Sequence, residues 1–195
     1  MRQEAAIEAI LARLRDDLPR NLFYHSVDHT LDVLDRVESL GRSEGVGESD
    51  LVLLRVAACY HDAGFLINNR DHERLGCKIV RTELPKYDFS PLHIETICGM
   101  IRATKVPQSP RNHLQEIICD AELDYLGRPD FYVIGERLYR ELKAFRILDS
   151  VESWNQLQIK FLRGHRYWTK TNIRERKPGK DAHLAELVKR WEVLP

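Results

Sequence analysis

His61 and Asp62 form an adjacent imidazole–carboxylate pair at the end of a strongly apolar segment. Residues 51–60 carry one charged side chain, Arg55, so this segment is predicted to be a helix buried on nearly all sides. A buried carboxylate must be paired, hydrogen-bonded or bound to a metal, because an isolated buried charge is very costly. His and Asp are both metal ligands, and one divalent cation would satisfy them together. The alternative is an Asp that hydrogen-bonds its neighbour and caps the turn at Gly64.

Two further histidines, His25 and His29, lie at the entry to a predicted helix, in the segment Y-H-S-V-D-H-T at residues 24–30. A lone His on an apolar face is usually a satisfied core residue. Two at this spacing, in a chain that also holds an adjacent His-Asp pair, favour a functional site. His29 continues an apolar stripe, since residues four, eight and eleven positions later are Val33, Val37 and Leu40.

Two aspartates, Asp120 and Asp124, lie in the segment C-D-A-E-L-D at the end of another apolar-striped helix. Asp120 follows Ile117 by three residues, which places it on the buried face. Asp124 comes four residues later on the same face, where like charges repel by a few tenths of a kcal/mol unless a cation lies beside them. The alternative is a solvated Asp124 and an Asp120 that caps a neighbouring element.

Together, His29, His61, Asp62 and Asp120 provide two nitrogens and two carboxylates from three predicted helices. This mixture suits octahedral Mn²⁺, Fe²⁺ or Mg²⁺ better than a closed tetrahedral zinc site, and it leaves positions open for water and a substrate oxygen. Metal-bound water has its pKa lowered toward neutrality and becomes a usable nucleophile. We therefore predict a metal site at these four residues.

The elements that must position these residues are helices, because apolar residues recur with helical spacing and no alternating strand pattern is present. Glycines and prolines in Gly41 to Asp50, in Val106 to Asn112 and at Pro178-Gly179 separate them. The sequence has no repeat, low-complexity tract or interdomain linker. It therefore predicts an all-α fold, a single-domain helical bundle over residues 1–195. The predicted helices cover about 2–17, 28–42, 49–62, 71–85, 90–103, 112–124, 129–145, 150–164, 167–175 and 180–193.

Composition argues against a nucleic-acid-binding, disulfide-bonded, membrane-spanning or secreted protein. Thirty basic side chains balance thirty acidic ones, so the composition shows no electrostatic drive toward a nucleic acid polymer or an anionic membrane. The four cysteines lack a C-x-x-C motif and lie among apolar residues, which indicates reduced core thiols. No run approaches the roughly 18 apolar residues of a membrane span, and the N-terminus lacks the apolar core of a signal peptide. We expect a cytoplasmic protein, and Trp154 and Trp191, if exposed, leave a homo-oligomer open.

The order H…HD…D resembles the HD-domain superfamily of metal-dependent phosphohydrolases, with Y-H-x-x-x-H-T before it and C-D-A-x-L-D-x-L-G after it. The resemblance covers about residues 20–170, with helical extensions at both ends. The first segment is also similar to the Y-H-N-x-x-H-A motif of cyclic-nucleotide phosphodiesterases, with Ser26 in place of Asn. The resemblance implies that His29 binds the metal and that His25 protonates the leaving oxygen. It also implies hydrolysis of a phosphate ester of a nucleotide or another small phosphorylated metabolite. In the hydrolysis that the resemblance implies, Asp62 is catalytic as well as a metal ligand, because it can orient the attacking water.

Five residues are candidate substrate contacts. Lys105, before a proline-containing loop, is the first candidate for a phosphate. His165 and Lys177 belong to a basic region with aromatic residues that could form the rim of an anion pocket, although a solvated basic face explains either residue equally well. Asp124 could orient a metal ligand or contact a substrate hydroxyl. His72 could contact substrate, bind a second metal or simply supply charge at a helix N-terminus.

We expect one divalent ion, Mn²⁺, Mg²⁺, Fe²⁺ or Ni²⁺. A second ion would need further ligands, and His93 and His113 show no pattern that would provide them. A non-catalytic nucleotide-binding regulatory module and a di-iron oxygenase on the same fold are the alternatives. The intact ligand set argues against the first, and the shortage of ligands argues against the second. The leading prediction is a phosphoric ester hydrolase.

Overall fold

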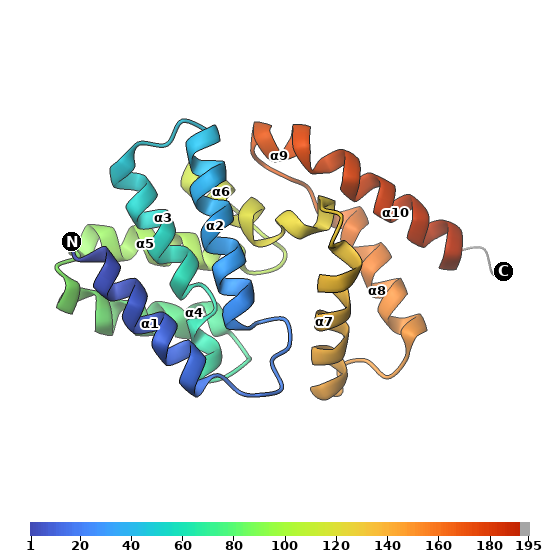
Figure 1. Ribbon diagram of the computed structural model, residues 1–195, viewed down its shortest axis with the longest axis horizontal. Coiled ribbons are helices and arrows are strands. Elements are labelled where there is room, and N and C mark those ends of the chain that lie inside the picture. The colour runs from blue at the N-terminus through green and yellow to red at the C-terminus, as the bar shows by residue number, and fades with distance from the viewer. Residues whose placement is uncertain (192–195) are drawn as a thin grey trace.

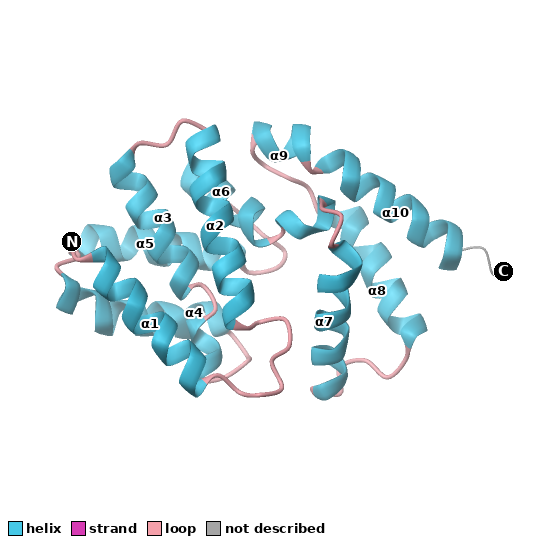
Figure 2. Cartoon of the chain, viewed as in Figure 1, coloured by secondary structure: helices cyan, strands magenta, loops and turns pink. Residues whose placement is uncertain are grey.

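A computed structural model describes residues 1–191, which form helices joined by loops and contain no strand (Figure 2). The all-α fold is therefore confirmed. Three short 3-10 helices, η1 (Ala63–Leu66), η2 (Leu84–Tyr87) and η3 (Asp124–Gly127), connect longer helices. The α-helices are α1 (Gln3–Asp17), α2 (Val27–Ser43), α3 (Glu48–Tyr60), α4 (His72–Glu83), α5 (Pro91–Thr104), α6 (His113–Glu122), α7 (Phe131–Ala144), α8 (Val151–Gly164), α9 (Lys170–Glu175) and α10 (Lys177–Trp191).

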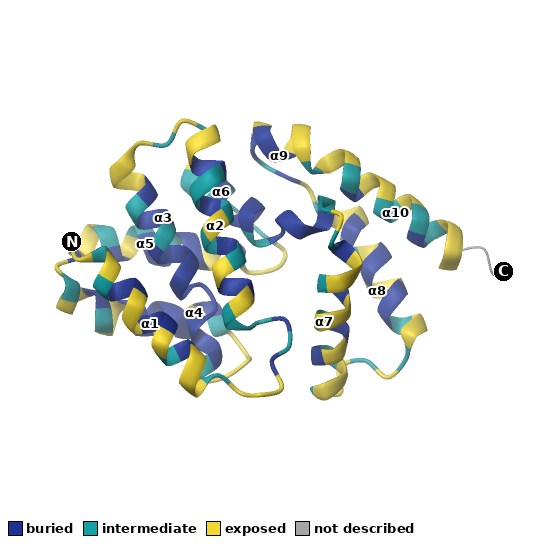
Figure 3. Ribbon diagram, in the orientation of Figure 1, coloured by how far each residue is buried: buried dark blue, intermediate teal, exposed yellow. Residues whose placement is uncertain are grey.

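Helix α3 lies at the centre of the N-terminal part, in contact with α1, α2, α5 and α6 (Figures 1 and 3). From Leu51 to Tyr60 only Val52 and Arg55 are partly exposed, and Arg55 pairs with Glu38 at the edge of the core. A helix that is apolar on nearly all sides must be surrounded by other helices. For this reason the residues that follow α3 in the chain, starting with His61, are in the interior.

A second apolar cluster is formed by η3, α7, α8 and α10, which lie to the right of α2 in Figure 1. It contains Phe131 from the start of α7 and Leu162 from α8. Tyr24, in the loop that leads into α2, belongs to this cluster, whereas Val33 on α2 belongs to the N-terminal one. The start of α2 therefore lies where the two clusters meet, and this is where His25 and His29 are found.

The predicted helices agree closely with the observed ones, with one instructive difference. Pro178 and Gly179 do not separate two helices, because both lie in the first turn of α10. Proline is tolerated there, since the first turn of a helix does not use its backbone N–H groups. Gly179 also permits a close approach, because a Cβ at this position would lie 2.3 Å from the carbonyl oxygen of Gly127.

The cysteines and the two tryptophans noted in the sequence differ in how far they are buried. All four cysteines are buried free thiols, in agreement with their prediction as core residues. Trp154 is buried and stacks on Tyr139 with ring centroids 5.8 Å apart, so it completes the core instead of forming an exposed patch. Trp191, in the last turn of α10, is 39% exposed. No helix within residues 1–191 has the length and apolar character needed to cross a bilayer.

Candidate metal and catalytic site

Three of the four predicted metal ligands lie together in the interior. His29 comes from the first turn of α2, and His61 and Asp62 follow α3 directly; all three are buried. One ligand atom from each lies within 4.8 Å of the other two. The Nε2 atoms of His29 and His61 are 3.3 Å apart. Asp62 Oδ2 lies 3.1 Å from His61 Nε2 and 3.6 Å from His29 Nε2.

Local packing turns both imidazoles toward this cluster. His61 Nδ1 lies 2.7 Å from the carbonyl oxygen of Ala58, to which it donates, so Nε2 faces the cluster. His29 continues the buried stripe of α2, as the sequence predicts. The ring of Tyr24 packs against that of His29, with centroids 4.6 Å apart. These contacts point one ring nitrogen of each imidazole at the cluster before any ion binds.

The electrostatics of the cluster fit a divalent cation. Asp62 Oδ2 is buried and lacks a hydrogen-bond partner within the described part of the chain. Burial lowers the pKa of His29 to about 3, so its imidazole is neutral. Burial also disfavours charge on His61, but the Asp62 carboxylate outweighs this effect and raises the pKa of His61 to about 9. Burial opposes ionisation of Asp62, yet His61 and His25 hold its pKa well below the ordinary value. The cluster thus favours positive charge at its centre.

His25 is held by a glutamate from the second apolar cluster. Its Nδ1 donates to Oε1 of Glu141, a buried residue of α7. Oε2 of Glu141 accepts from the backbone N–H groups of Tyr24 at 2.8 Å and His25 at 3.0 Å. Burial disfavours the charged imidazole, but Asp62 and Glu141 outweigh it and raise the pKa of His25. Nothing in the sequence around Glu141 predicted this role, because R-E-L-K is typical of an exposed helical turn.

His72, a candidate substrate contact, lies beside the cluster. Its Nε2 is 3.5 Å from Oδ1 of Asp62, and its ring stacks on Phe65, which in turn stacks on His25. The centroid distances are 4.3 Å for Phe65–His72 and 4.4 Å for His25–Phe65. Gly64 allows this arrangement, since a Cβ there would lie 1.9 Å from the carbonyl oxygen of His72. Burial lowers the pKa of His72, so it adds a neutral imidazole to the site.

Asp120, the fourth predicted ligand, is buried as expected but is not part of this cluster. Its carboxylate accepts hydrogen bonds from the backbone N–H groups of Trp168 and Thr169, at 2.9 and 2.8 Å, and from the Thr169 hydroxyl at 2.7 Å. Asp120 therefore anchors the segment before α9 to α6. This corresponds to the alternative in which Asp120 caps a neighbouring element.

Glu122, two residues after Asp120, faces the site instead. It lines a cavity of about 240 Å³ together with His25 and Tyr24. Burial raises the pKa of Glu122 to about 7; the charge of His61 opposes this shift and that of Asp62 adds to it. Sequence reasoning missed Glu122, although it lies inside the C-D-A-E-L-D segment. The helical periodicity could have indicated it, because residues two positions apart on a helix point about 200° apart, so Asp120 and Glu122 cannot face the same neighbours.

The remaining candidate substrate contacts are dispersed. Asp124 is fully buried and pairs with Arg36 at 3.0 Å and Arg176 at 2.9 Å, so it ties α2 to the end of α9. Lys105 pairs with Asp71, the residue before His72, at 2.8 Å. Lys177 pairs with Asp181 in its own helix and is exposed. His165 lines a separate cavity of about 460 Å³.

The comparisons with known proteins agree with this geometry. The family model for the HD domain matches residues 26–154, more than half of the chain. Similar solved structures include a predicted HD superfamily hydrolase from an uncultured Thermotogales bacterium, with 21% identity, coverage of 95% of this chain and 90% of that chain, and a TM-score of 0.59. Bacillus subtilis YpgQ in complex with ADP shares 18% identity over 97% of both chains, with a TM-score of 0.64. A Lactobacillus plantarum protein shares 15% identity over 100% of both chains, with a TM-score of 0.64.

No curated protein matches the sequence. At these identities the similar structures establish a shared fold. The family match covers the segment that holds His29, His61, Asp62 and Glu122. The chain therefore belongs to the HD domain family.

Proposed function

We propose that this protein hydrolyses a phosphate ester of a nucleotide or of another small phosphorylated metabolite in a metal-dependent reaction. One observation carries the proposal: the buried cluster of His29, His61 and Asp62, in which a carboxylate oxygen without a well-formed hydrogen bond lies beside two imidazole nitrogens. Membership of the HD domain family supports the same chemistry. His29, His61 and Asp62 would hold the ion.

The side chains around the cluster have separate tasks. A bound divalent ion would activate water and stabilise charge on the phosphoryl oxygens. Asp62 would orient the attacking water. His25, whose pKa is raised, would donate its proton from Nε2 to the leaving oxygen, because Glu141 occupies Nδ1. His72 would contact the substrate from the other face of Phe65.

We assign the fourth metal-holding side chain to Glu122 in place of Asp120. The carboxylate of Asp120 already accepts three hydrogen bonds from Trp168 and Thr169. Glu122 interacts electrostatically with His61 and Asp62 and lines the same cavity as His25. Since a nearby cation favours the ionised form of a carboxyl group, metal binding would lower the pKa of Glu122.

A nucleotide is the substrate class that we favour. Bacillus subtilis YpgQ, which has a similar fold, was solved in complex with ADP. In this chain the cavity that contains His25 and Glu122 continues along apolar and aromatic side chains from α7 and α8, among them Phe131 and Trp154. Such a lining suits an organic leaving group better than free phosphate.

A screen of metals and substrates tests the proposed function. Metal-free protein is reloaded with Mn²⁺, Mg²⁺, Fe²⁺ or Ni²⁺, and phosphate release is measured with nucleotides and generic phosphate esters. We expect metal-dependent turnover that Asp62→Ala abolishes and that Asp16→Ala, a change at an exposed residue of α1, leaves intact. Equal activity in Asp62→Ala, or no bound metal in the wild type, would refute hydrolysis at this site. Two bound irons with oxygen consumption would favour an oxygenase.

A further inference from the structure

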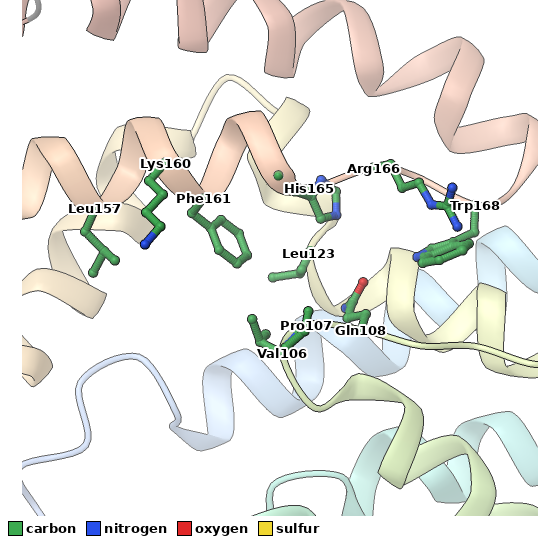
Figure 4. A pocket seen from close by; sticks show the side chains of 11 residues that line it. Val106, Pro107, Gln108, Leu123, Leu157, Lys160, Phe161, His165, Arg166 and Trp168 are labelled. Carbon is green, nitrogen blue, oxygen red and sulfur yellow. The ribbon is translucent and has the colours of Figure 1, made fainter.

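The cavity of about 460 Å³ lies between α8, the loop after α5 and the loop before α9. Figure 4 shows that its two ends differ in character. Leu157 and Phe161 supply the apolar surface at one end, with Lys160 between them, whereas Gln108, His165 and Trp168 gather with Arg166 at the opposite, polar end. The volume is within the range typical of pockets for small organic ligands.

The polar end contains buried hydrogen-bonding atoms that lack partners. Ten side-chain nitrogen and oxygen atoms are in this state in the described part of the chain, and four of them belong to this end. A buried polar atom without a partner is costly, so native proteins keep few of them. Their concentration in one cavity indicates a ligand that supplies the missing partners. The four atoms are Gln108 Oε1, Trp168 Nε1 and the two ring nitrogens of His165.

The surrounding contacts determine which of these atoms donate and which accept. Gln108 Nε2 donates to the carbonyl oxygen of Cys119 at 2.9 Å and to Glu122 Oε2 at 3.0 Å, which fixes the amide and leaves Oε1 as a free acceptor. Trp168 Nε1 can only donate. Burial lowers the pKa of His165 to about 3, so its neutral ring offers one donor and one acceptor. A complementary ligand therefore carries both an N–H donor and an acceptor on one edge.

We propose that this cavity binds the nucleobase of the substrate, an inference that rests on the proposed function. A nucleobase is a planar heterocycle with donors and acceptors at its edge and apolar faces that pack against aromatic and aliphatic side chains such as Phe161 and Leu157. The cavity shares Leu123 and Phe161 with the one that reaches His25 and Glu122. Gln108 links them directly through its hydrogen bond to Glu122. The base and the phosphate of one nucleotide thus occupy adjoining cavities.

Adenosine is the probe, because it carries a nucleobase and no phosphate. Its binding to the full-length protein, measured by isothermal titration calorimetry, does not depend on hydrolysis, so the two proposals fail independently. Trp168→Phe removes the indole N–H but keeps an aromatic ring and the backbone N–H that donates to Asp120. We expect this change to weaken adenosine binding about tenfold without loss of thermal stability. The control Trp191→Phe, at an exposed position, should leave the affinity unchanged.

Two further measurements complete the test. Purine riboside, which lacks the exocyclic amine of adenosine, should bind about tenfold more weakly because Gln108 Oε1 loses its donor. His165→Phe keeps a ring against Phe161 and should also weaken binding, which covers the case of a misfolded Trp168→Phe protein. No binding of adenosine at millimolar concentration would overturn the proposal. Equal affinities of the wild type, Trp168→Phe and His165→Phe would do the same, and would leave ordered water as the partner of these atoms.

Discussion

Substitution of Glu141 by Gln tests the role of His25 as the proton donor. The carboxylate of Glu141 accepts the Nδ1 proton of His25 and two backbone N–H groups. The amide of Gln retains one oxygen for the backbone groups, but it presents an NH₂ group to Nδ1 and removes the negative charge. A hydrogen bond to a charged group contributes about 1.5–3 kcal/mol, and a change of one in pKa corresponds to about 1.36 kcal/mol. The pKa of His25 should therefore fall by about 1 to 2.

The sign of the pH effect follows from the role of the acid. A general acid must be protonated, so a lower pKa of His25 moves the basic limb of the kcat profile to lower pH by about 1 to 2. Above that limb kcat should fall about 10- to 100-fold, while at lower pH it should approach the wild-type value. The assay is the pH dependence of kcat for Glu141→Gln and for Glu136→Gln, an exposed control on the same helix. An unmoved basic limb would refute the reasoning, as would an equal loss when Glu141→Gln is added to His25→Ala.

Three further predictions concern the metal and the fold. Glu122→Gln should weaken metal binding about tenfold or more in a metal titration. Asp120→Asn should retain the metal affinity but lower the free energy of unfolding by about 1–3 kcal/mol. The opposite pattern would make Asp120 the ligand. Asp124→Asn should lower the free energy of unfolding by about 3–5 kcal/mol in urea, because the fully buried carboxylate is the shared ion-pair partner of the partly buried Arg36 and Arg176; a change below about 1 kcal/mol would contradict that role. A chelator should lower the free energy of unfolding of the metal-loaded wild type by about 2.7 kcal/mol when the free metal concentration before chelation is 100 times Kd, and it should leave the stability of Asp62→Ala unchanged.

The helices were predictable because each carries an apolar face with a clear period. His29 illustrates this, since its place on the stripe with Val33 and Val37 determined both its helix and its burial. His61 and Asp62 were predictable for the same reason, because they follow a helix that is apolar on nearly all sides. Local periodicity shows which residues face the interior, and the side chains of these three residues do lie close together there.

Long-range contacts were not predictable from such patterns. Asp120 does face the interior, but the groups that it meets there belong to residues 168 and 169, which are distant in the sequence. Glu141 reaches His25 across 116 positions. Its own segment has the composition of an exposed turn. Tertiary packing therefore decides which carboxylate faces the candidate metal site and which one anchors a loop.

The central claim is that a metal held by His29, His61 and Asp62 supports hydrolysis. Stepwise addition of Mn²⁺ to metal-free protein, with bound metal and phosphate release measured in the same samples, tests it most directly. The account predicts that the rate of phosphate release rises in proportion to occupancy of one site per chain, and that Asp62→Ala loses both together. Full phosphate release without bound metal, or tight Mn²⁺ binding and turnover in Asp62→Ala, would contradict it.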